Sequence, residues 1–187
     1  MGTLRAPNPA KYFVGLLSSD GELLDSIEKD LSAVLGAIDA RSNTLPWNLS
    51  RFYEDEMGVD LLRRFVSFRP LVSPGDLAEI KLQTHELERK YQLGVAPGSG
   101  RRINIDPGYL DLGKVVLAST KNAGHRIYLK SGIYGETTLL YYNGAFRACP
   151  YTYPDYLWAE TLSFLISLRS RYLSQMKGVD EVDKPAI

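Results

Sequence analysis

The strongest constraint on the fold is a change of hydrophobic period close to the N-terminus. Residues 12–17 are nearly all apolar, as in a strand that is buried on both faces. Directly after them, Ser19-Asp20-Gly21-Glu22 matches a capping box and predicts that a helix begins there. Apolar residues then recur with helical spacing as far as Leu35, and Gly36 is placed to end the helix. The chain therefore opens with a strand followed by a helix.

The same strand–helix order returns further along the chain. Residues 37–45 and 61–68 are predicted strands, and Ser73-Pro74 supplies an N-cap and a proline at the first position of a second helix. Residues 101–106 then alternate as in a strand. The order strand, helix, strand, strand, helix, strand is that of the split βαβ motif. We therefore expect an α+β fold with a ferredoxin-like core, an antiparallel or mixed sheet and both helices on one face.

The rest of the chain predicts an extension of this sheet. Residues 112–118 and 125–142 favour strands, Asn143-Gly144 is a strong hairpin turn, and residues 145–148 return as a short strand. Pro154 opens a final helix. We expect a C-terminal β-meander and a last helix in a single domain over residues 1–187, with residues 1–10 as an extended leader and residues 177–187 as a frayed tail.

The charge balance limits the classes of function. Lys plus Arg and Asp plus Glu each number 22, and this balance argues against a protein that coats nucleic acid or a membrane surface. One cysteine allows no disulfide within the chain, and with two histidines it argues against a zinc site. No apolar run resembles a signal peptide or is long enough to span a bilayer, so we expect a cytoplasmic protein.

The register of the hairpin over residues 125–139 decides which side chains share a face. A two-residue turn would set Ile127 opposite Glu136, an apolar residue against a charge. A three-residue loop ending in a left-handed Gly132 sets three better-matched pairs opposite each other: Leu129 and Ile133, Tyr128 and Tyr134, and Arg126 and Glu136. The second register separates apolar from polar side chains, and we adopt it.

In this register one face of the sheet collects polar and aromatic side chains, while Ile127 and Leu129 face the helices. If residues 101–106 join the sheet, their polar residues point the same way. The predicted polar face carries Arg102, Asn104, Asp106, Arg126, Tyr128, Tyr134 and Glu136. With the helices on the other side, this face is open to a ligand. The alternative is an ordinary solvated face, on which Arg126 and Glu136 form a cross-strand pair of about 0.2–1 kcal/mol.

Three of these positions could carry chemistry. Asp106 lies at a strand end before Pro107-Gly108, where a rigid scaffold suits a general base, although an Asx turn explains it equally well. His125 begins a strand and could transfer protons, or simply make a local hydrogen bond. Glu136 completes the candidate catalytic set. His85, in the middle of the second helix, carries no functional prediction.

A divalent cation is a further hypothesis. The acidic loop over residues 53–58 could fold over the sheet, so that Glu56 joins Asp106 and Glu136 as oxygen ligands of a hard cation. The alternative is a solvated loop. A phosphate-binding Walker A motif is absent, because the glycine-rich residues 94–100 lack the Lys-Ser/Thr ending and precede a strand, which favours a connector.

Several segments together carry a resemblance to a known family. They are Lys11-Tyr12-Phe13-Val14-Gly15-Leu16-Leu17-Ser18-Ser19, Tyr53-Glu54-Asp55-Glu56-Met57-Gly58, Asn104-Ile105-Asp106-Pro107-Gly108-Tyr109-Leu110, His125-Arg126-Ile127-Tyr128-Leu129, Gly132-Ile133-Tyr134 and Thr152-Tyr153-Pro154-Asp155-Tyr156. Through them the chain resembles an uncharacterised, mainly bacterial family, domain of unknown function 4416, over nearly its whole length. The resemblance implies no established reaction. Some similar sequences are labelled GTP-binding, a label that the absent Walker A motif does not support.

The sequence thus leads to one functional hypothesis with two rivals. The first is a site for a small anionic, phosphorylated or nucleotide-like ligand on the open face, in which Arg102 and Arg126 neutralise the anion and His125 transfers protons. The site could belong to a metal-assisted enzyme. The rivals are a module that binds RNA or protein through its sheet aromatics, with RNA disfavoured by the zero net charge, and a structural homodimer.

Overall fold

The computed structural model describes residues 2–51, 53–93 and 100–182. Its first part contains β1 (Ala10–Ser18), α1 (Gly21–Leu35), β2 (Ile38–Arg41), β3 (Leu45–Pro46), α2 (Glu54–Met57), β4 (Leu62–Val72), the 3-10 turn η1 (Pro74–Asp76) and α3 (Leu77–Lys90). The second part contains β5 (Asn104–Leu110), β6 (Lys114–Ser119), β7 (Ile127–Lys130), β8 (Ile133–Tyr142), β9 (Ala145–Ala148), the 3-10 turn η2 (Pro154–Leu157) and α4 (Ala159–Val182). The predicted connector over residues 94–100 lies, up to residue 99, outside the described residues, and so does the end of the predicted tail.

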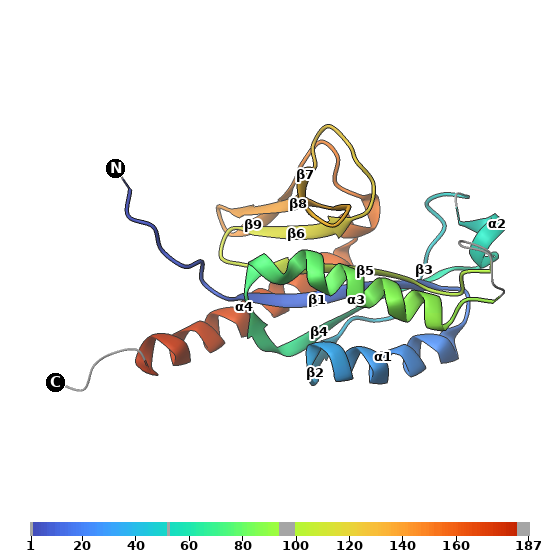
Figure 1. The fold of residues 1–187 in the computed structure, drawn as a ribbon, viewed down its shortest axis with the longest axis horizontal. Coiled ribbons are helices and arrows are strands. Elements are labelled where there is room, and N and C mark those ends of the chain that lie inside the picture. The colour runs from blue at the N-terminus through green and yellow to red at the C-terminus, as the bar shows by residue number, and fades with distance from the viewer. Residues whose placement is uncertain (1, 52, 94–99, 183–187) are drawn as a thin grey trace.

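The strands form one antiparallel sheet. Their order is β2-β4-β1-β5-β6-β8-β7, with β3 beside β4 and β9 beside β8. Strand β1 lies between β4 and β5, and all nine of its residues are buried, as the apolar run predicted. The fold is therefore α+β with an antiparallel sheet, and β6 to β9 extend it beyond β5 (Figure 1).

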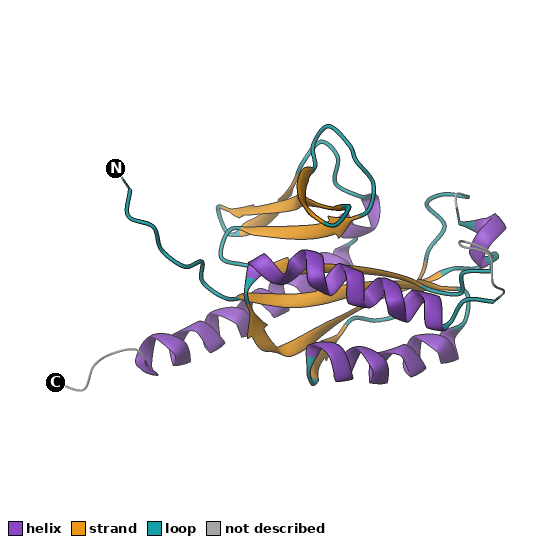
Figure 2. Cartoon of the chain, viewed as in Figure 1, coloured by secondary structure: helices purple, strands orange, loops and turns teal. Residues whose placement is uncertain are grey.

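Helices cover both faces of this sheet. Helices α1 and α3 share one apolar cluster with β1, as predicted for the two early helices. Helix α4 packs on the opposite face, where Phe164, Leu165 and Tyr172 bury Phe13 and Phe65 (Figure 2). The prediction of an open face is therefore wrong over β1 and β4. The physical reason is that these strands carry large apolar side chains on both faces, so each face needs a cover.

Local signals placed most element ends within a few residues. Asp20, one residue after the predicted Ser19, is the N-cap of α1 and accepts a hydrogen bond from the N–H of Leu23 at 3.0 Å. Gly36 ends α1 with φ 88°, as expected. Asn143 and Gly144 both have positive φ in the turn between β8 and β9, as predicted. Helix α4, by contrast, continues to Val182, past the residue where a frayed tail was predicted to begin.

The β7–β8 hairpin follows the predicted register only in part. Tyr128 does lie opposite Tyr134 and Gly132 has φ 78°, but Lys130 rather than Leu129 lies opposite Ile133 because a bulge interrupts β7. Both Ser131 and Gly132 adopt positive φ, so the turn is tighter than predicted. β7 ends the sheet, and all four of its residues are exposed. The prediction that Ile127 and Leu129 face the helices is wrong.

Strand β5 also runs further than predicted. Asp106 does not end it, because Pro107 pairs with Val14 and Gly108 with Phe13 of β1. Gly108 permits the close approach of β6, since a Cβ there would lie 2.5 Å from the Leu117 side chain. The Pro-Gly pair is therefore part of a strand.

Candidate functional site

The site begins where β5 and β6 part. Their pairing covers Gly108 to Leu110 and stops at Gly108 opposite Leu117, while β5 stays paired with β1 as far as Asn104. The two strands thus form a fork. Alternate residues of a strand present their backbone groups to the same edge, so the missing N–H of Pro107 falls on the same edge as the backbone groups of Ile105. A proline suits that position because no ladder bond to β6 is made there.

Side chains of α3 replace the missing strand. The Ile105 N–H donates to Oε1 of Glu88 at 2.6 Å, and the Ile105 carbonyl accepts from Nζ of Lys81 at 2.7 Å. Both side chains are buried. The backbone of β5 is therefore satisfied without β6, and the fork can stay open.

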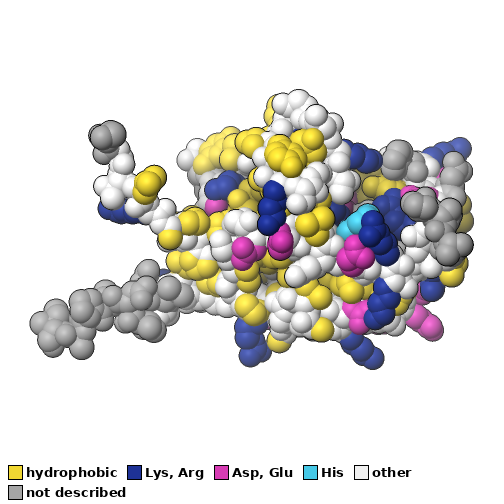
Figure 3. Space-filling model, in the orientation of Figure 1, with side chains coloured by type: hydrophobic (Ala, Val, Ile, Leu, Met, Phe, Trp, Pro, Cys, Tyr) yellow, Lys and Arg dark blue, Asp and Glu magenta, His cyan; other side chains and the backbone are white. Residues whose placement is uncertain are grey.

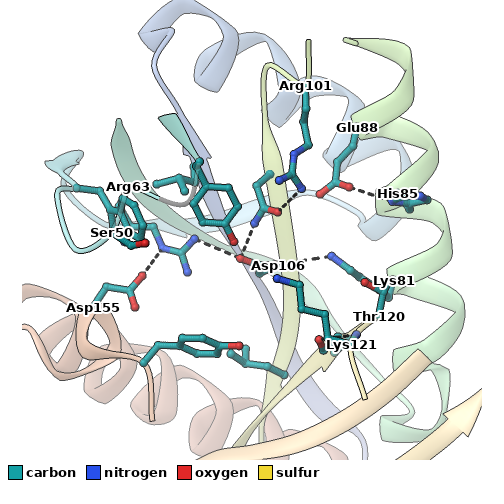
Figure 4. A pocket seen from close by; sticks show the side chains of 18 of the residues that line it. Ser50, Arg63, Lys81, His85, Glu88, Arg101, Asp106, Thr120, Lys121 and Asp155 are labelled. Carbon is teal, nitrogen blue, oxygen red and sulfur yellow. Dashed lines mark hydrogen bonds and ion pairs between the residues drawn. The ribbon is translucent and has the colours of Figure 1, made fainter. Parts of the chain in front are cut away.

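A cleft of about 780 Å³ occupies the fork. It is lined by α3, β5, the β3–α2 connection, η2, and the end of β6 with the residues that follow it. Near α3, a histidine lies among basic and acidic side chains on the molecular surface (Figure 3). In the close view, basic side chains approach Asp106 from several directions (Figure 4).

Asp106 projects from β5 at the centre of this cleft. Its Oδ2 accepts from Nδ2 of Asn104 at 2.7 Å and lies 3.4 Å from Nη1 of Arg63. Its Oδ1 lies 3.7 Å from Nζ of Lys81. The carboxylate is therefore held by three neighbours while about a third of the side chain stays exposed (32%).

Arg63 anchors the floor of the cleft from β4. Its side chain is only 5% exposed, its Nε lies 3.0 Å from Oδ2 of Asp155, and its guanidinium stacks over the Phe65 ring at 4.8 Å. Gly15 makes room for it, since a Cβ there would lie 2.7 Å from Nη2 of Arg63. Burial alone would lower the pKa of Arg63, but the carboxylates of Asp155 and Asp106 raise it above the usual value. Arg63 is thus a fixed positive charge.

Aromatic side chains form another wall. The rings of Trp47 and Tyr53 meet edge to face at 5.7 Å, and the guanidinium of Arg101 lies 5.3 Å from the centre of the Tyr53 ring. Arg101 is paired with Glu56 at 2.5 Å. Burial and the negative charge of Asp106 raise the pKa of Tyr53 to about 12, so its hydroxyl remains protonated near neutral pH.

Apart from Nε of Arg63, which is ion-paired with Asp155, three buried polar atoms on cleft-lining residues have no hydrogen-bond partner within the described chain. They are Nε1 of Trp47, Nε of Arg101 and the hydroxyl oxygen of Tyr156. Burial raises the pKa of Tyr156 well above its usual value, so its hydroxyl keeps its proton. All three groups can therefore donate a hydrogen bond, and the two nitrogens can only donate.

The structure brings four of the predicted site residues into the cleft: Glu56, Asn104, Asp106 and Glu136. Among the described residues, no three acidic, histidine or cysteine side chains lie close enough to hold a metal ion, so the set of Glu56, Asp106 and Glu136 is not gathered into such a cluster. Sharing one cleft is therefore the extent of their association.

The remaining predicted residues do not line this cleft. Arg102 pairs with Asp20 at 2.5 Å, and Tyr128 and Tyr134 form an edge-to-face pair on the exposed hairpin. His125 and Arg126 lie behind Glu136 and hold it, with Nε2 of His125 at 2.9 Å and Nε of Arg126 at 2.6 Å. The predicted contact between Arg126 and Glu136 is confirmed. The Glu136 side chain is only 1% exposed, so the solvated-face alternative is wrong at this position.

Sequence reasoning missed several cleft residues, above all those of α3. Lys81, His85 and Glu88 were not predicted, although Lys81 and Glu88 are seven residues apart and thus on one side of a helix. That side also carries the buried Leu77 and Thr84. Charged residues within the buried stripe of an amphipathic helix were the available signal.

Fold and site together define a class: an α+β protein with an antiparallel sheet that splits around a polar cleft. The family model described as Domain of unknown function (DUF4416) matches residues 8–172, and the chain belongs to this family. Searches of curated proteins and of solved structures found no match. Among the described residues, no helix combines the length and apolarity needed to cross a membrane.

Proposed function

We propose that the protein binds a small anionic ligand, rich in acceptor oxygens and phosphorylated or nucleotide-like, in the cleft between β5 and β6. The observation that carries this proposal is the set of buried donors on Trp47, Arg101 and Tyr156. A buried donor without an acceptor costs about 1–3 kcal/mol, so such groups call for an acceptor. Phosphate and nucleobase oxygens are acceptors of this kind.

The size and lining of the cleft support this choice. Small-molecule sites commonly enclose roughly 300–1,000 Å³, and this cleft has about 780 Å³. Its basic lining residues are Arg63, Lys81, Arg89, Arg101 and Lys121. Glu136 is balanced by Arg126 from outside the lining, and Glu88 accepts a backbone N–H. With Glu136 balanced by Arg126, the lining holds five basic residues against the four acids Glu56, Glu88, Asp106 and Asp155, a small positive excess that a ligand anion would complement.

We further propose that β1, α1, β2, β4, α3 and β5 form a ferredoxin-like core. Its support is the antiparallel order β2-β4-β1-β5, with α1 and α3 on one face. In this arrangement the cleft lies at the junction between the core and the added strands β6 to β9. The added strands then supply one side of the site.

The test is a thermal-shift panel of inorganic phosphate, nucleoside mono-, di- and triphosphates, sugar phosphates and short RNA, because a ligand that binds the folded state raises its melting temperature. We expect at least one phosphorylated compound to raise it, and Arg101→Ala to abolish the effect. Arg102→Ala is the matched control, because this neighbouring arginine pairs with Asp20. Loss of the shift in Arg102→Ala, or no shift with any phosphorylated compound, contradicts the proposal. RNA binding that depends on Tyr128 would place the function on the exposed hairpin instead.

A further inference from the structure

Helix α3 presents a histidine to the cleft beside a buried carboxylate. His85 lines the cleft with 43% of its side chain exposed, and the Glu88 side chain one turn further along is 6% exposed. Nδ1 of His85 lies 3.1 Å from Oε2 of Glu88. In Figure 4 Lys81 reaches from α3 toward Asp106, and a dashed line joins Glu88 to His85 on the same helix.

The backbone of β5 fixes the orientation of Glu88. Its other oxygen, Oε1, accepts the N–H of Ile105 at 2.6 Å, so both oxygens of the carboxylate are engaged. A carboxylate only accepts, so the imidazole places its proton on Nδ1. Nε2 is then the nitrogen that can accept or release a proton.

We propose that His85 is the proton-transferring group of this cleft, held in one tautomer by Glu88, and that the anion it meets is a phosphate monoester. This inference rests on the proposed function. A phosphate monoester monoanion carries one dissociable proton, and the unprotonated Nε2 of a neutral imidazole can accept it. In this step the phosphate O–H bond breaks and an Nε2–H bond forms. The products are an imidazolium and a phosphate dianion, and the Nδ1 proton stays on the ring beside Glu88.

Other charged groups of the cleft set the field in which this proton moves. From α3 itself these are Lys81, Glu88 and Arg89. From the other elements they are Glu56, Arg63, Arg101, Asp106, Lys121, Glu136 and Asp155. Arg63 lies between Asp106 and Asp155, and Arg101 is paired with Glu56. Lys81 donates to the Ile105 carbonyl and lies 3.7 Å from Oδ1 of Asp106, so it too is held in place at the cleft surface.

The chain provides an internal control, because its other histidine is His125. That ring stacks on Tyr151 at 3.9 Å between centres, and its Nε2 faces Glu136. The proposal therefore predicts opposite tautomers: a proton on Nδ1 in His85 and on Nε2 in His125. It also predicts that a ligand affects the first ring alone.

The experiment is NMR of protein labelled with ¹⁵N-histidine, with signals assigned through the variant His125→Gln. Long-range nitrogen–proton correlations at a pH where both rings are neutral should show the Nδ1–H form of His85. An Nε2–H form of His85 in the wild-type protein overturns the role of Glu88. Glu88→Gln should redistribute the tautomers of His85 and leave those of His125 unchanged.

Adenosine monophosphate and inorganic phosphate are then the probes. Each is expected to shift the His85 signals toward the imidazolium form, and His85→Asn should weaken binding of the monophosphate about tenfold. His85→Asn is a mild change at an exposed side chain, so this arm remains readable if Glu88→Gln does not fold. Binding that requires Arg101 but leaves the His85 signals unchanged sinks the inference and spares the proposed function. No binding of either probe sinks the inference, whereas the proposed function fails only if the wider panel fails too.

Discussion

The cleft lies between two histidine–glutamate pairs that look alike and differ in what else each glutamate binds. On the β8 side, Glu136 faces His125 and also Arg126, whose Nε lies 2.6 Å away. On the α3 side, Glu88 faces His85 and the backbone N–H of Ile105. One carboxylate is therefore balanced by a permanent cation, and the other by a neutral backbone donor.

This difference indicates different roles for the two pairs, one in stabilising the structure and one in the cleft. Arg126 also donates to the hydroxyl of Tyr153 and to the carbonyl of Lys121, so its contact with Glu136 ties the connection after β6 to β8 and η2. The ring of His125 stacks on Tyr151 beside these contacts. His85 lies at the cleft surface, and its carboxylate partner orients it without holding a second charged side chain. The pair of His125 and Glu136 therefore stabilises the β8 side of the cleft, whereas the pair of His85 and Glu88 exposes an imidazole to the cleft.

The largest expected effect comes from removing the charge of Glu136. Glu136→Gln leaves Arg126, with 6% of its side chain exposed, without its carboxylate, and breaking such a buried pair costs about 3–5 kcal/mol. Urea denaturation measures this change in the free energy of unfolding. Glu86→Gln is the control, because Glu86 pairs with Arg89 on the surface and should change stability by less than about 1 kcal/mol. Equal losses of unfolding free energy in the two variants would mean that Glu136 stabilises the fold no more than a surface carboxylate does.

The α3 pair should respond to the loss of an acceptor rather than of a charge. Glu88→Ala leaves the buried N–H of Ile105 unpaired, at a cost of about 1–3 kcal/mol, whereas Glu88→Gln keeps an acceptor oxygen and should cost less than half as much. Amide hydrogen exchange at Ile105 reports this contact directly. Its protection should fall in Glu88→Ala and survive in Glu88→Gln. The reverse order would mean that the charge of Glu88 is its main contribution.

The comparison also shows what the sequence could predict. Local signals predicted the fold class, because capping residues, Gly36 and Asn143-Gly144 determine helix ends and turns only a few residues away in the sequence. Alternation also gave the contact between Arg126 and Glu136. The cover of the second face by α4 was missed, since the apolar run of β1 predicted burial on both faces without naming the helix that covers the far one. Which helix covers that face depends on contacts between residues that are far apart in the sequence.

The site was half predictable for a related reason. Asp106 and Glu136 were predicted because polar residues on neighbouring strands share a face by alternation. The fork depends on where β5 stops pairing with β6, and Pro107-Gly108 was interpreted as a turn. Without the fork, nothing in the sequence joined Lys81 and Glu88 to β5. His125 was proposed because it begins a predicted strand, whereas His85 lies in the middle of a predicted helix.

Alkaline pH tests the aromatic wall through the hydroxyl of Tyr53. Tyr53 has its pKa raised, mainly by burial, to about 12, while in the unfolded chain it ionises near 10. Its contribution to stability is therefore fully present below about pH 10 and is lost as the pH rises toward 12.

At pH 11 this loss amounts to about 1 kcal/mol, from the difference between the two pKa values. Urea midpoints measured between pH 9 and 11 should fall less steeply for Tyr53→Phe than for the wild type. Tyr153→Phe tests the Glu136 side in the same way, since burial and the charge of Glu136 also raise the pKa of Tyr153. Identical slopes for Tyr53→Phe and the wild type would mean that water reaches the Tyr53 hydroxyl freely.

The smallest effects come from the two histidines themselves, and they test the comparison most directly. His125→Gln loses the stacked contact with Tyr151, for which the expected cost is about 0.5–1.5 kcal/mol, whereas His85→Gln at a partly exposed position should stay within about 0.5 kcal/mol. Binding of a phosphorylated ligand should show the opposite order: weakened in His85→Gln and retained in His125→Gln wherever the protein is folded. A variant that loses both stability and ligand binding would show that its histidine stabilises the fold and also takes part in binding. If that variant is His85→Gln, the division between a structural and a presenting pair is wrong, because the α3 pair would then hold the fork together as well as face the ligand.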